Sequence, residues 1–315
     1  MIFSKTLSVA ALALAAIASV FVDASPIPAS QVEAYVPVAE RVYTAEQLEH
    51  HAALRKRGLP GVNDWNCKPS QAHPKPLILI HGLIANEWDN WLYMAPRFKA
   101  KGYCVYALTY GSLPGIPLLA GLDSMETGAA QLSTFVDKVL ASTNTTKVDF
   151  VGHSQGSLMP RYYLKFLGGA AKVDKFGAFG TIAYGTDLLG LIPLATSLGL
   201  YDPIKKILDP VCKSCFQFLI GSDFLNKLNA GGDTVPGVQY KFIVSKYDEI
   251  VTPYTNGKLK DVNPKATNVV LQDLCSVDLS EHAAQMLDPI VFHSLNAFLD
   301  SAAPQNVNCL SAFLK

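Results

Sequence analysis

Short, unbroken apolar runs alternate with longer segments of helical period from Lys75 onward. The run at 76–80 has no polar position and stops at His81. Apolarity without alternation predicts a strand that is buried on both faces, as strands of a parallel sheet are. Further strands are predicted at 103–108, 148–151, 176–183, 239–245 and 268–271.

Segments with a helical repeat separate these strands. Helices are predicted over 90–101, 124–141, 155–167 and 289–299. In the segment 124–141 apolar residues recur at intervals of four and three, and Asp123 and Glu126 are placed to cap its start. The alternation of strands and helices predicts an α/β fold, with a mostly parallel sheet that carries helices on both faces.

One long segment, about 185–237, interrupts the alternation. It contains scattered Leu and Ile together with four prolines, and we interpret it as a cap-like insertion over the sheet. Three roles stay open for this insertion and for the Pro- and Gly-rich stretch 113–122. They could wall a pocket for hydrocarbon chains, act as a movable cover, or contribute ordinary core residues beneath a long loop.

The first 24 residues have the layout of a secretory signal peptide. Lys5 precedes an apolar run at 7–22 that is short for a bilayer span and ends at Asp23. Small residues, including Ala24, occupy the positions where a signal peptidase would cut. This layout predicts a secreted, extracellular protein with no transmembrane anchor in its mature chain.

Residues 25–57 end in a basic triplet at 55–57, followed by a Gly- and Pro-containing turn. Two interpretations stay open. The segment is either a pro-segment that is cut at the triplet, or an amphipathic N-terminal helix that stays on the chain. In both cases residues 58–315 remain, and that length suits one sizeable domain.

The composition and net charge of the chain indicate which kinds of partner it can bind. Half of the residues are hydrophobic, 17% are charged, and 26 basic against 26 acidic residues give a formal net charge of zero. A neutral domain has no broad positive face for a phosphate backbone, so we do not expect nucleic acid as a partner. An uncharged or apolar partner is expected instead.

Six cysteines in a chain that is expected to be exported predict disulfides. Sequence alone leaves the pairing open. The set we favour joins Cys67 with Cys104, Cys212 with Cys215, and Cys275 with Cys309. Cys212 and Cys215 also fit a redox or metal motif, but no second CxxC and no nearby histidine completes a zinc site, so we favour a structural bridge.

One acceptable sequon for N-glycosylation occurs in the chain. Asn144 is followed by Thr145 and Thr146, which is the spacing that an acceptor asparagine requires. We therefore expect Asn144 in a surface loop, glycosylated if the producing cell has that machinery.

The segment Gly152-His-Ser-Gln-Gly156 fits the pattern G-x-S-x-G and lies between a predicted buried strand and a predicted helix. Glycines at both ends let the strand and helix backbones approach closely while the turn lifts the hydroxyl of Ser154 clear. This predicts a nucleophile elbow. The backbone N–H of Gln155, and that of Leu83 after the first strong strand, are expected to form an oxyanion hole.

A serine nucleophile needs a histidine that takes its proton and a carboxylate that orients the histidine. In this fold the chain order is serine, acid, histidine. Only His282 and His293 follow Ser154. We favour His282, because it lies in a predicted loop, whereas His293 falls inside the predicted C-terminal helix.

For the acid we favour Asp248, which lies just past the end of the predicted strand 239–245, where sites in open parallel sheets gather. Glu249 is adjacent but is expected to point elsewhere. Asp223 and Asp233 lie in the insertion, where Asp is a common turn residue.

Several motifs, taken in chain order, resemble one known family. They are NDWNCKPS at 63–70, HG at 81–82, GYCV at 102–105, MPRYY at 159–163, YDEIVTP at 247–253 and DLSEH at 278–282. Over roughly residues 59–310 the chain resembles the secreted class 2 triacylglycerol lipases, which have the α/β-hydrolase fold. The resemblance implies Ser154, Asp248 and His282 as the triad, paired cysteines, and no metal or other cofactor.

Two features depart from that family. Ser157 follows Gly156 where the resembling sequences often have a second glycine, and a pro-segment with a basic triplet is not typical of the bacterial members. The second feature suggests a eukaryotic secretory route. In addition, Pro160 inside the predicted helix 155–167 predicts a kink or a loosely held first turn.

These observations predict a secreted serine hydrolase that cleaves carboxylic esters, and specifically a triacylglycerol lipase that meets its ester or lipid substrate at an oil–water interface. A short-chain esterase and an acyltransferase that uses the same acyl-enzyme are the alternatives within the enzyme class. From another class, a catalytically silent α/β-hydrolase that serves as a secreted binding protein is the alternative. The intact set of Ser, Asp and His argues against it.

Overall fold

The computed structural model describes residues 58–113, 119–261, 266–306 and 308–309. The predicted signal peptide at 1–24 and the segment 25–57 lie outside these residues, as do positions 114–118 of the stretch 113–122. The chain divides into two units, Met1–Gly58 and Leu59–Lys315. Every helix and strand given below belongs to the second unit.

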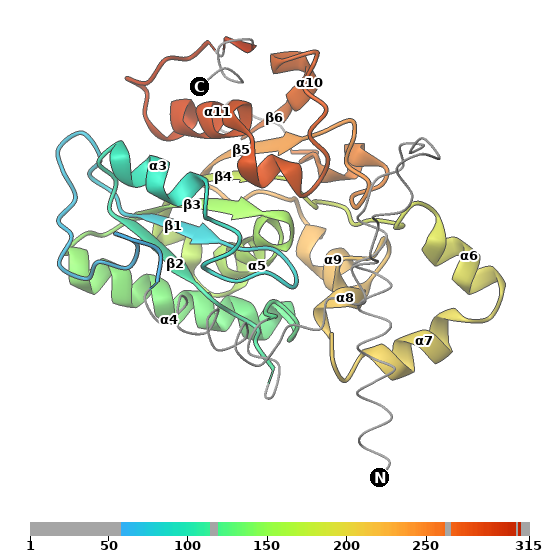
Figure 1. Ribbon diagram of the computed structural model, residues 1–315. Coiled ribbons are helices and arrows are strands. Elements are labelled where there is room, and N and C mark those ends of the chain that lie inside the picture. The colour runs from blue at the N-terminus through green and yellow to red at the C-terminus, as the bar shows by residue number, and fades with distance from the viewer. Residues whose placement is uncertain (1–57, 114–118, 262–265, 307, 310–315) are drawn as a thin grey trace, which may run out of the picture. The chain divides into compact units, whose positions relative to one another are not determined.

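Six strands form one parallel sheet in the order β2-β1-β3-β4-β5-β6 (Figure 1). From β1 the chain adds β2 on one side and then returns to build the other four strands on the opposite side. The predicted mostly parallel sheet is confirmed, and each predicted strand is present with its ends displaced by a few residues. The strands are β1 (Leu77–Ile80), β2 (Val105–Leu108), β3 (Val148–His153), β4 (Val173–Phe179), β5 (Gln239–Val244) and β6 (Ala266–Val270).

The burial of the first three strands explains their unbroken apolar runs. Every residue of β1, β2 and β3 is buried. Ile78 packs into the hydrophobic cluster on one face of the sheet, and its neighbour Leu79 packs into the cluster on the other. Both faces of these strands therefore need apolar side chains, because helices cover both.

Helices lie on the two faces of the sheet (Figure 1). One face carries α4 (Met125–Thr143) and α5 (Met159–Phe166), and the other carries α3 (Met94–Ala100) and α11 (Pro289–Leu299). The rings of Phe98 in α3 and Phe292 in α11 are 4.9 Å apart, so these two helices share one apolar layer. Shorter helical turns are η3 (Ser154–Ser157), η4 (Gly169–Ala171), η5 (Tyr254–Gly257), α10 (Leu271–Leu274) and η6 (Ala284–Leu287).

The start of α4 differs from the prediction. Its N-cap is Ser124, whose hydroxyl accepts a hydrogen bond from the N–H of Thr127. The carboxylate of Asp123 accepts from the Ser124 N–H instead, and that of Glu126 accepts from Gln217. The predicted capping by Asp123 and Glu126 is wrong, because the short serine side chain already occupies the cap position.

The predicted helix 155–167 is divided. The turn η3 spans Ser154–Ser157, and α5 begins only at Met159. Pro160 lies in the first turn of α5, where helical N–H groups have no intrahelical acceptor and a proline loses nothing. The break before Pro160 agrees with the kink that this residue predicts.

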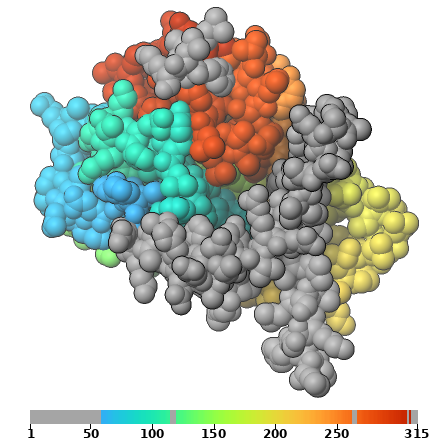
Figure 2. Space-filling model, viewed as in Figure 1, coloured from blue at the N-terminus to red at the C-terminus, as the bar shows by residue number. Residues whose placement is uncertain are grey.

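The insertion 185–237 contains four short helices. Its last helix packs on α5 and places Leu225 and Leu228 in the core, whereas α6 and α7 have no buried residue. Figure 1 places α6 and α7 away from the sheet, beyond α8 and α9, and Figure 2 shows their yellow residues at the margin of the visible face. The helices are α6 (Leu191–Ser197), α7 (Tyr201–Leu208), α8 (Ser214–Gln217) and α9 (Asp223–Asn229).

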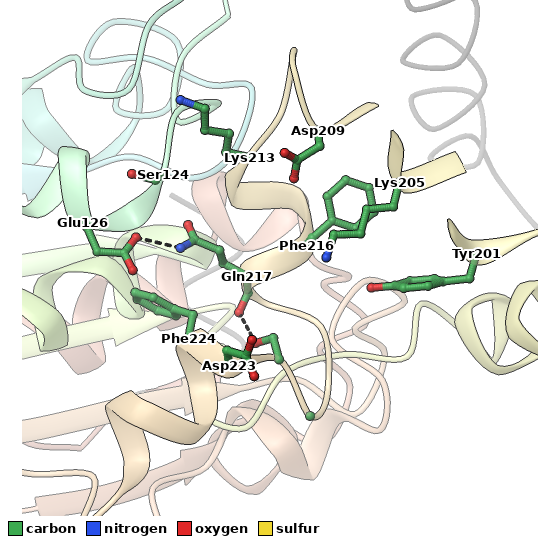
Figure 3. A pocket seen from close by; sticks show the side chains of 12 residues that line it. Ser124, Glu126, Tyr201, Lys205, Asp209, Lys213, Phe216, Gln217, Asp223 and Phe224 are labelled. Atoms are coloured by element: carbon green, nitrogen blue, oxygen red, sulfur yellow. Dashed lines mark hydrogen bonds between the residues drawn. The ribbon is translucent and has the colours of Figure 1, made fainter. Parts of the chain in front are cut away.

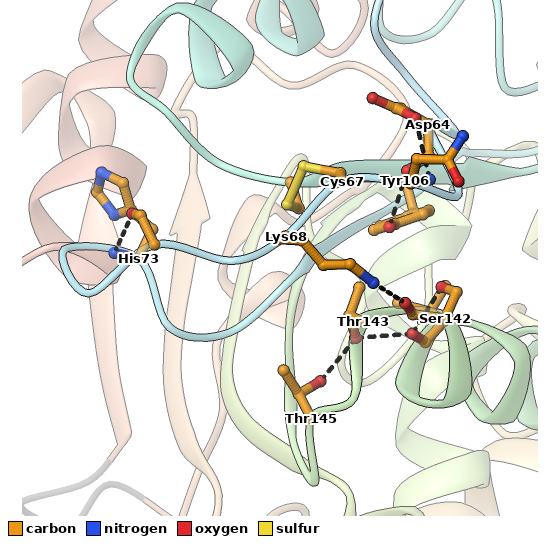
Figure 4. The surroundings of a disulfide bond; sticks show 12 residues. Asp64, Cys67, Lys68, His73, Tyr106, Ser142, Thr143 and Thr145 are labelled. Carbon is orange, nitrogen blue, oxygen red and sulfur yellow. Dashed lines mark hydrogen bonds between the residues drawn. A yellow bond between two sulfur atoms is a disulfide. The ribbon is translucent and has the colours of Figure 1, made fainter.

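Three disulfides are present, and their pairing is the one that the sequence analysis favoured: Cys67–Cys104, Cys212–Cys215 and Cys275–Cys309. The first joins the loop before β1 to the residue before β2. Beside it, the hydroxyl of Tyr106 donates to the carbonyl of Asp64, and Lys68 donates to the carbonyl of Ser142 in α4 (Figure 4). These contacts fasten the loop that begins the second unit to β2 and to α4.

Candidate active site

The sharpest turn of the site is at Ser154, directly after β3. Ser154 has a φ of +55°, a left-handed conformation that costs a non-glycine residue energy. Its surroundings require glycine on both sides, because a Cβ on Gly152 would overlap the carbonyl of Gly156, and a Cβ on Gly156 would overlap the carbonyl of Ile80. The turn therefore brings η3 tightly over the sheet edge and places Ser154 at the carboxyl ends of the strands.

The side chains of Asp248 and His282, each on its own loop, form a hydrogen-bonded chain with Ser154. Nε2 of His282 lies 2.8 Å from Oγ of Ser154, and Nδ1 of His282 lies 2.8 Å from Oδ2 of Asp248. The structure thus brings together the three residues that the sequence analysis singled out. The hydrogen-bonded chain offers a path for a proton from the serine hydroxyl to the imidazole.

The carboxylate of Asp248 is held by its own loop. Its Oδ1 accepts hydrogen bonds from the N–H groups of Ile250 at 3.0 Å and Val251 at 2.7 Å. The side chain is also buried, with Asp248 only 6% exposed. The other oxygen is therefore kept on the imidazole of His282.

The charge state of His282 depends on opposing effects. Burial lowers its pKa, because a buried cation loses hydration, but the carboxylates of Asp248, Glu249 and Glu281 outweigh burial and raise the pKa above its ordinary value. A histidine with a raised pKa takes up a proton readily, as a general base must. With Nδ1–H donated to Asp248, the lone pair of Nε2 faces Ser154.

Glu249 contacts the site in a way that the sequence analysis missed. It was expected to point elsewhere, but its Oε2 accepts from the backbone N–H of His282 at 3.1 Å. Burial raises the pKa of Glu249. This side chain supports the loop that carries His282.

Asn90 and His153 complete the support, although the sequence analysis gave neither a role. Oδ1 of Asn90 accepts from the N–H of Gly82 at 3.0 Å and lies 3.0 Å from Nδ1 of His153. Because this oxygen is an acceptor, His153 donates from Nδ1. Burial, and then the neighbouring His282, hold the pKa of His153 well below its ordinary value, so its ring is neutral. No local pattern marks Asn90, since its contact with His153 joins residues that are 63 positions apart in the chain.

The two expected oxyanion donors lie on the segments that flank Ser154. The loop at Gly82 and Leu83 touches the elbow, since a Cβ on Gly82 would be 3.0 Å from Cβ of Ser154. Gln155 is the second residue of η3, whose first N–H groups have no acceptor within the turn. The next residue of the loop, Ile84, donates its N–H to the carbonyl of Ala120 at 2.8 Å and so anchors the loop.

Other titratable candidates lie outside this hydrogen-bonded chain. His81 is buried, its Nε2 accepts from the N–H of Tyr110, and burial lowers its pKa to about 4, so it fastens the loop as a neutral ring. His293 is exposed on α11. Asp233 accepts from the hydroxyl of Tyr184, and Asp223 begins α9.

The expected glycosylation residue is on the surface. Asn144 is exposed at the C-cap of α4 and has a φ of +55°. Thr143 and Thr145 beside it join their hydroxyls at 2.9 Å, as Figure 4 shows. The position suits an accessible sequon.

The described part of the chain contains neither a metal-binding cluster nor a membrane-spanning helix. Among these residues no group of three or more His, Cys, Asp or Glu side chains is arranged to hold a metal ion. None of the helices in the same residues has the length and apolarity to cross a bilayer.

Two solved structures share this architecture. Lipase B of Aspergillus fumigatus has a TM-score of 0.61 and 20% identity, with 92% of this chain and 67% of that chain covered. The mature lipase BlEst2 of Bacillus licheniformis has a TM-score of 0.54 and 18% identity, with 74% and 94% covered. With the parallel sheet and the turn at Ser154, these likenesses define the chain as an α/β-hydrolase fold.

Sequence comparison gives the family. A triacylglycerol lipase of Pseudarthrobacter phenanthrenivorans is 37% identical over 92 residues, which are 28% of this chain and 27% of that protein. One of Burkholderia plantarii matches equally over 28% of this chain and 24% of its own length. The chain thus spans about a quarter of these curated relatives. A family profile described as "Lipase (class 2)" matches residues 74–291, and the chain belongs to that family.

Proposed function

We propose that this protein is a serine hydrolase that cleaves carboxylic esters, with Ser154 as nucleophile, His282 as general base and acid, and Asp248 as the orienting carboxylate. The observation that carries the proposal is the hydrogen-bonded chain from Asp248 through His282 to Ser154, with both distances 2.8 Å. Membership of the class 2 lipase family supports an ester as the substrate.

The reaction proceeds through an acyl-enzyme. His282 takes the hydroxyl proton as Oγ of Ser154 attacks the ester carbonyl carbon, and the N–H groups of Leu83 and Gln155 stabilise the oxyanion. His282 then protonates the leaving alcohol. A water molecule, deprotonated by His282, then attacks the acyl carbon. As the bond from that carbon to Oγ of Ser154 breaks and the acid leaves, His282 returns the proton to Oγ and the hydroxyl is restored.

The proposed substrate is a lipid ester, and specifically a triacylglycerol. Large aliphatic side chains in and beside α6 and α7 are between 43% and 62% exposed, and exposed apolar side chains gathered in this way mark an interaction surface. Contact of this apolar surface with an oil–water interface would bring the site to its insoluble substrate. The residues are Leu189, Leu191, Leu194, Leu198, Leu200, Ile204 and Ile207.

We further propose that the protein is secreted. The layout of residues 1–24 supports export, and the three disulfides fit an oxidising compartment. Expression of the full chain in a secreting host, with N-terminal sequencing of the product in the medium, tests this proposal and locates the cleavage site.

The activity is tested with p-nitrophenyl esters of short and long acyl chains and with an emulsified triglyceride. We expect the parent to hydrolyse all three and Ser154→Ala, folded as judged by circular dichroism, to lose at least about a thousandfold in kcat. A folded Ser154→Ala variant with the parental rate would overturn the proposal. Activity on short soluble esters alone would indicate an esterase, and ester formation with excess alcohol would indicate an acyltransferase. A parent that neither hydrolyses any ester nor reacts with a fluorophosphonate would indicate a silent binding protein.

The lipid surface is tested with Leu194→Gln and Leu198→Gln. Both should lower the rate on the emulsion more than the rate on a short soluble ester, because they remove exposed apolar area and leave the site intact. Leu167→Gln, at a 39% exposed leucine at the end of α5, is the matched control. Equal effects on both substrates would contradict a role of α6 in contact with the interface.

A further inference from the structure

The disulfide turn 212–215 attaches the insertion to the segment beside the oxyanion loop. Ser214 is fully buried, and its hydroxyl donates to the carbonyl of Gly121 at 2.5 Å. Its backbone N–H donates to the carbonyl of Leu122 at 3.3 Å. The bridge between Cys212 and Cys215 closes the turn around it. One residue, restrained by a disulfide, therefore makes two hydrogen bonds to adjacent carbonyls.

Gly121 in turn lies against the segments of both oxyanion donors. Its carbonyl also accepts from Nε2 of Gln155 at 2.9 Å. It has a φ of +74°, and a Cβ there would lie 3.2 Å from the carbonyl oxygen of Gly82 and 3.3 Å from Cα of Leu83. Such close packing means that a displacement of Gly121 displaces Leu83 and the side chain of Gln155 with it.

Further contacts dock the turn on the start of α4. Oε1 of Gln217 accepts from the N–H of Met125 at 2.7 Å, and Nε2 of Gln217 donates to Glu126 at 2.6 Å. Lys213 and Asp123 form an ion pair at 3.1 Å. Figure 3 shows Gln217 bonded to Glu126 at the wall of a pocket that α4 shares with the insertion. The turn is thus fastened on both sides of Ser214.

We propose that Ser214 is a positioning residue for the oxyanion hole, and that the turn 212–215 couples the insertion to the catalytic site. The inference rests on the proposed function. Ser214 does not touch the reacting atoms. It holds the carbonyl of Gly121, and Gly121 packs against the backbone of Leu83 and accepts from the side chain of Gln155. Oxyanion donors accelerate a reaction only when they are aimed at the developing charge, so a small displacement lowers kcat and leaves ground-state binding unchanged.

Ser214→Ala tests the proposal, with Ser197→Ala as matched control. Ser197 lies in the same insertion, is exposed, and donates only to the carbonyl of Leu194 within α6. For Ser214→Ala we expect kcat on a short soluble ester to fall roughly ten- to hundredfold with KM changed less than about twofold. Affinity for phenylboronic acid, whose adduct with Ser154 places an oxygen in the oxyanion hole, should fall by the same factor as kcat/KM. The midpoint of the pH–rate profile of Ser214→Ala should equal that of the parent, because the substitution leaves the contacts of His282 unchanged.

The outcomes separate this inference from the proposed function. If Ser214→Ala equals Ser197→Ala in kcat and in boronate affinity, the positioning role is wrong. It is also wrong if kcat per folded molecule stays parental while only the melting temperature falls. A parent that neither hydrolyses esters nor binds the boronate would overturn the proposed function itself.

If Ser214→Ala does not fold, a second variant can test the same coupling. The double variant Cys212→Ala/Cys215→Ala keeps the serine and removes the bridge that restrains it. We expect a smaller fall in kcat, again with KM unchanged. Parental kcat and boronate affinity in this double variant would overturn the coupling through the disulfide turn.

Discussion

Oδ1 of Asn90 lies 3.0 Å from Nδ1 of His153, and this buried pair connects the oxyanion loop to the elbow. The same oxygen accepts the N–H of Gly82 at 3.0 Å. On the far side of the ring, Nε2 of His153 lies 3.4 Å from the carbonyl of His282. One amide and one imidazole thus connect the oxyanion loop, the elbow and the loop of His282.

Replacing Asn90 by Ala should slow the reaction. The N–H of Gly82 and Nδ1 of His153 would lose their common acceptor, and an unsatisfied buried donor costs roughly 1–3 kcal/mol of stability. We expect kcat to fall about ten- to a hundredfold, because the oxyanion loop loses its anchor. Steady-state kinetics on a soluble ester measure the effect, and Asn66→Ala, at an exposed asparagine, is the control. Equal kcat in the two variants would contradict the anchoring role.

The pH dependence of activity should follow His282. The base must be neutral to accept the proton of Ser154, so the rate falls as the pH drops through the pKa of His282, which lies above its ordinary value despite burial because of Asp248. Asp248→Asn should lower this midpoint, since it removes the charge that stabilises the imidazolium, and should also lower the plateau by a large factor. A pH–rate profile of both proteins checks both effects. A midpoint that stays in place in Asp248→Asn would show that another group controls the profile.

The glycine that follows the nucleophile should not accept a side chain. Gly156→Ala would press a methyl group onto the backbone carbonyl of Ile80, and we expect it to abolish folding or activity. Gly168→Ala is the control for backbone conformation, because Gly168 has a φ of +77° but no atom within 4 Å of the added Cβ. Gly168→Ala should lower the free energy of unfolding by only about 1 kcal/mol, as measured by urea unfolding. Similar losses in the two variants would contradict the steric argument.

Stability should fall as the pH rises past the pKa of the buried carboxyl of Asp288. Asp288 is only 3% exposed and Asp278 only 1%, and Oδ2 of each carboxyl is buried without a hydrogen-bond partner among the described residues. Burial, together with Asp278, raises the pKa of Asp288 to about 6. An acid with a raised pKa contributes stability that is complete below the unfolded pKa, near 4, and is lost as the pH rises through the folded pKa.

We therefore expect the free energy of unfolding of the parent to fall by roughly 1–3 kcal/mol between about pH 4 and pH 7, relative to that of Asp288→Asn. The amide keeps the oxygen that accepts from the N–H of Ile290 and stays uncharged at both pH values. Urea unfolding of both proteins at the two pH values measures the difference. Asp202→Asn, at an exposed aspartate, should follow the parent. A constant difference between the parent and Asp288→Asn would contradict the raised pKa of Asp288.

Local sequence patterns predicted many of the helices and strands correctly. Helix α11 spans the predicted residues, and the strands of the first half are buried as their unbroken apolar runs predict. The predictions of helix starts were less accurate. Ser124, and not Asp123 or Glu126, caps α4, and α5 begins at Met159 with Pro160 in its first turn. Boundaries depend on single caps and turns, which a repeat of apolar positions does not record.

The sequence by itself determined the order of strands and helices, the elbow around Ser154 and the choice of His282, because each depends on neighbouring residues or on chain order. Only the tertiary structure decided which distant loops meet. Asp248 and Ser154 are 34 and 128 residues from His282, and Ser214 is 93 residues from Gly121. Such contacts form because parallel strands deliver their carboxyl-end loops to one edge of the sheet, and packing there selects Asn90, Glu249 and Ser214 by geometry that no local pattern contains.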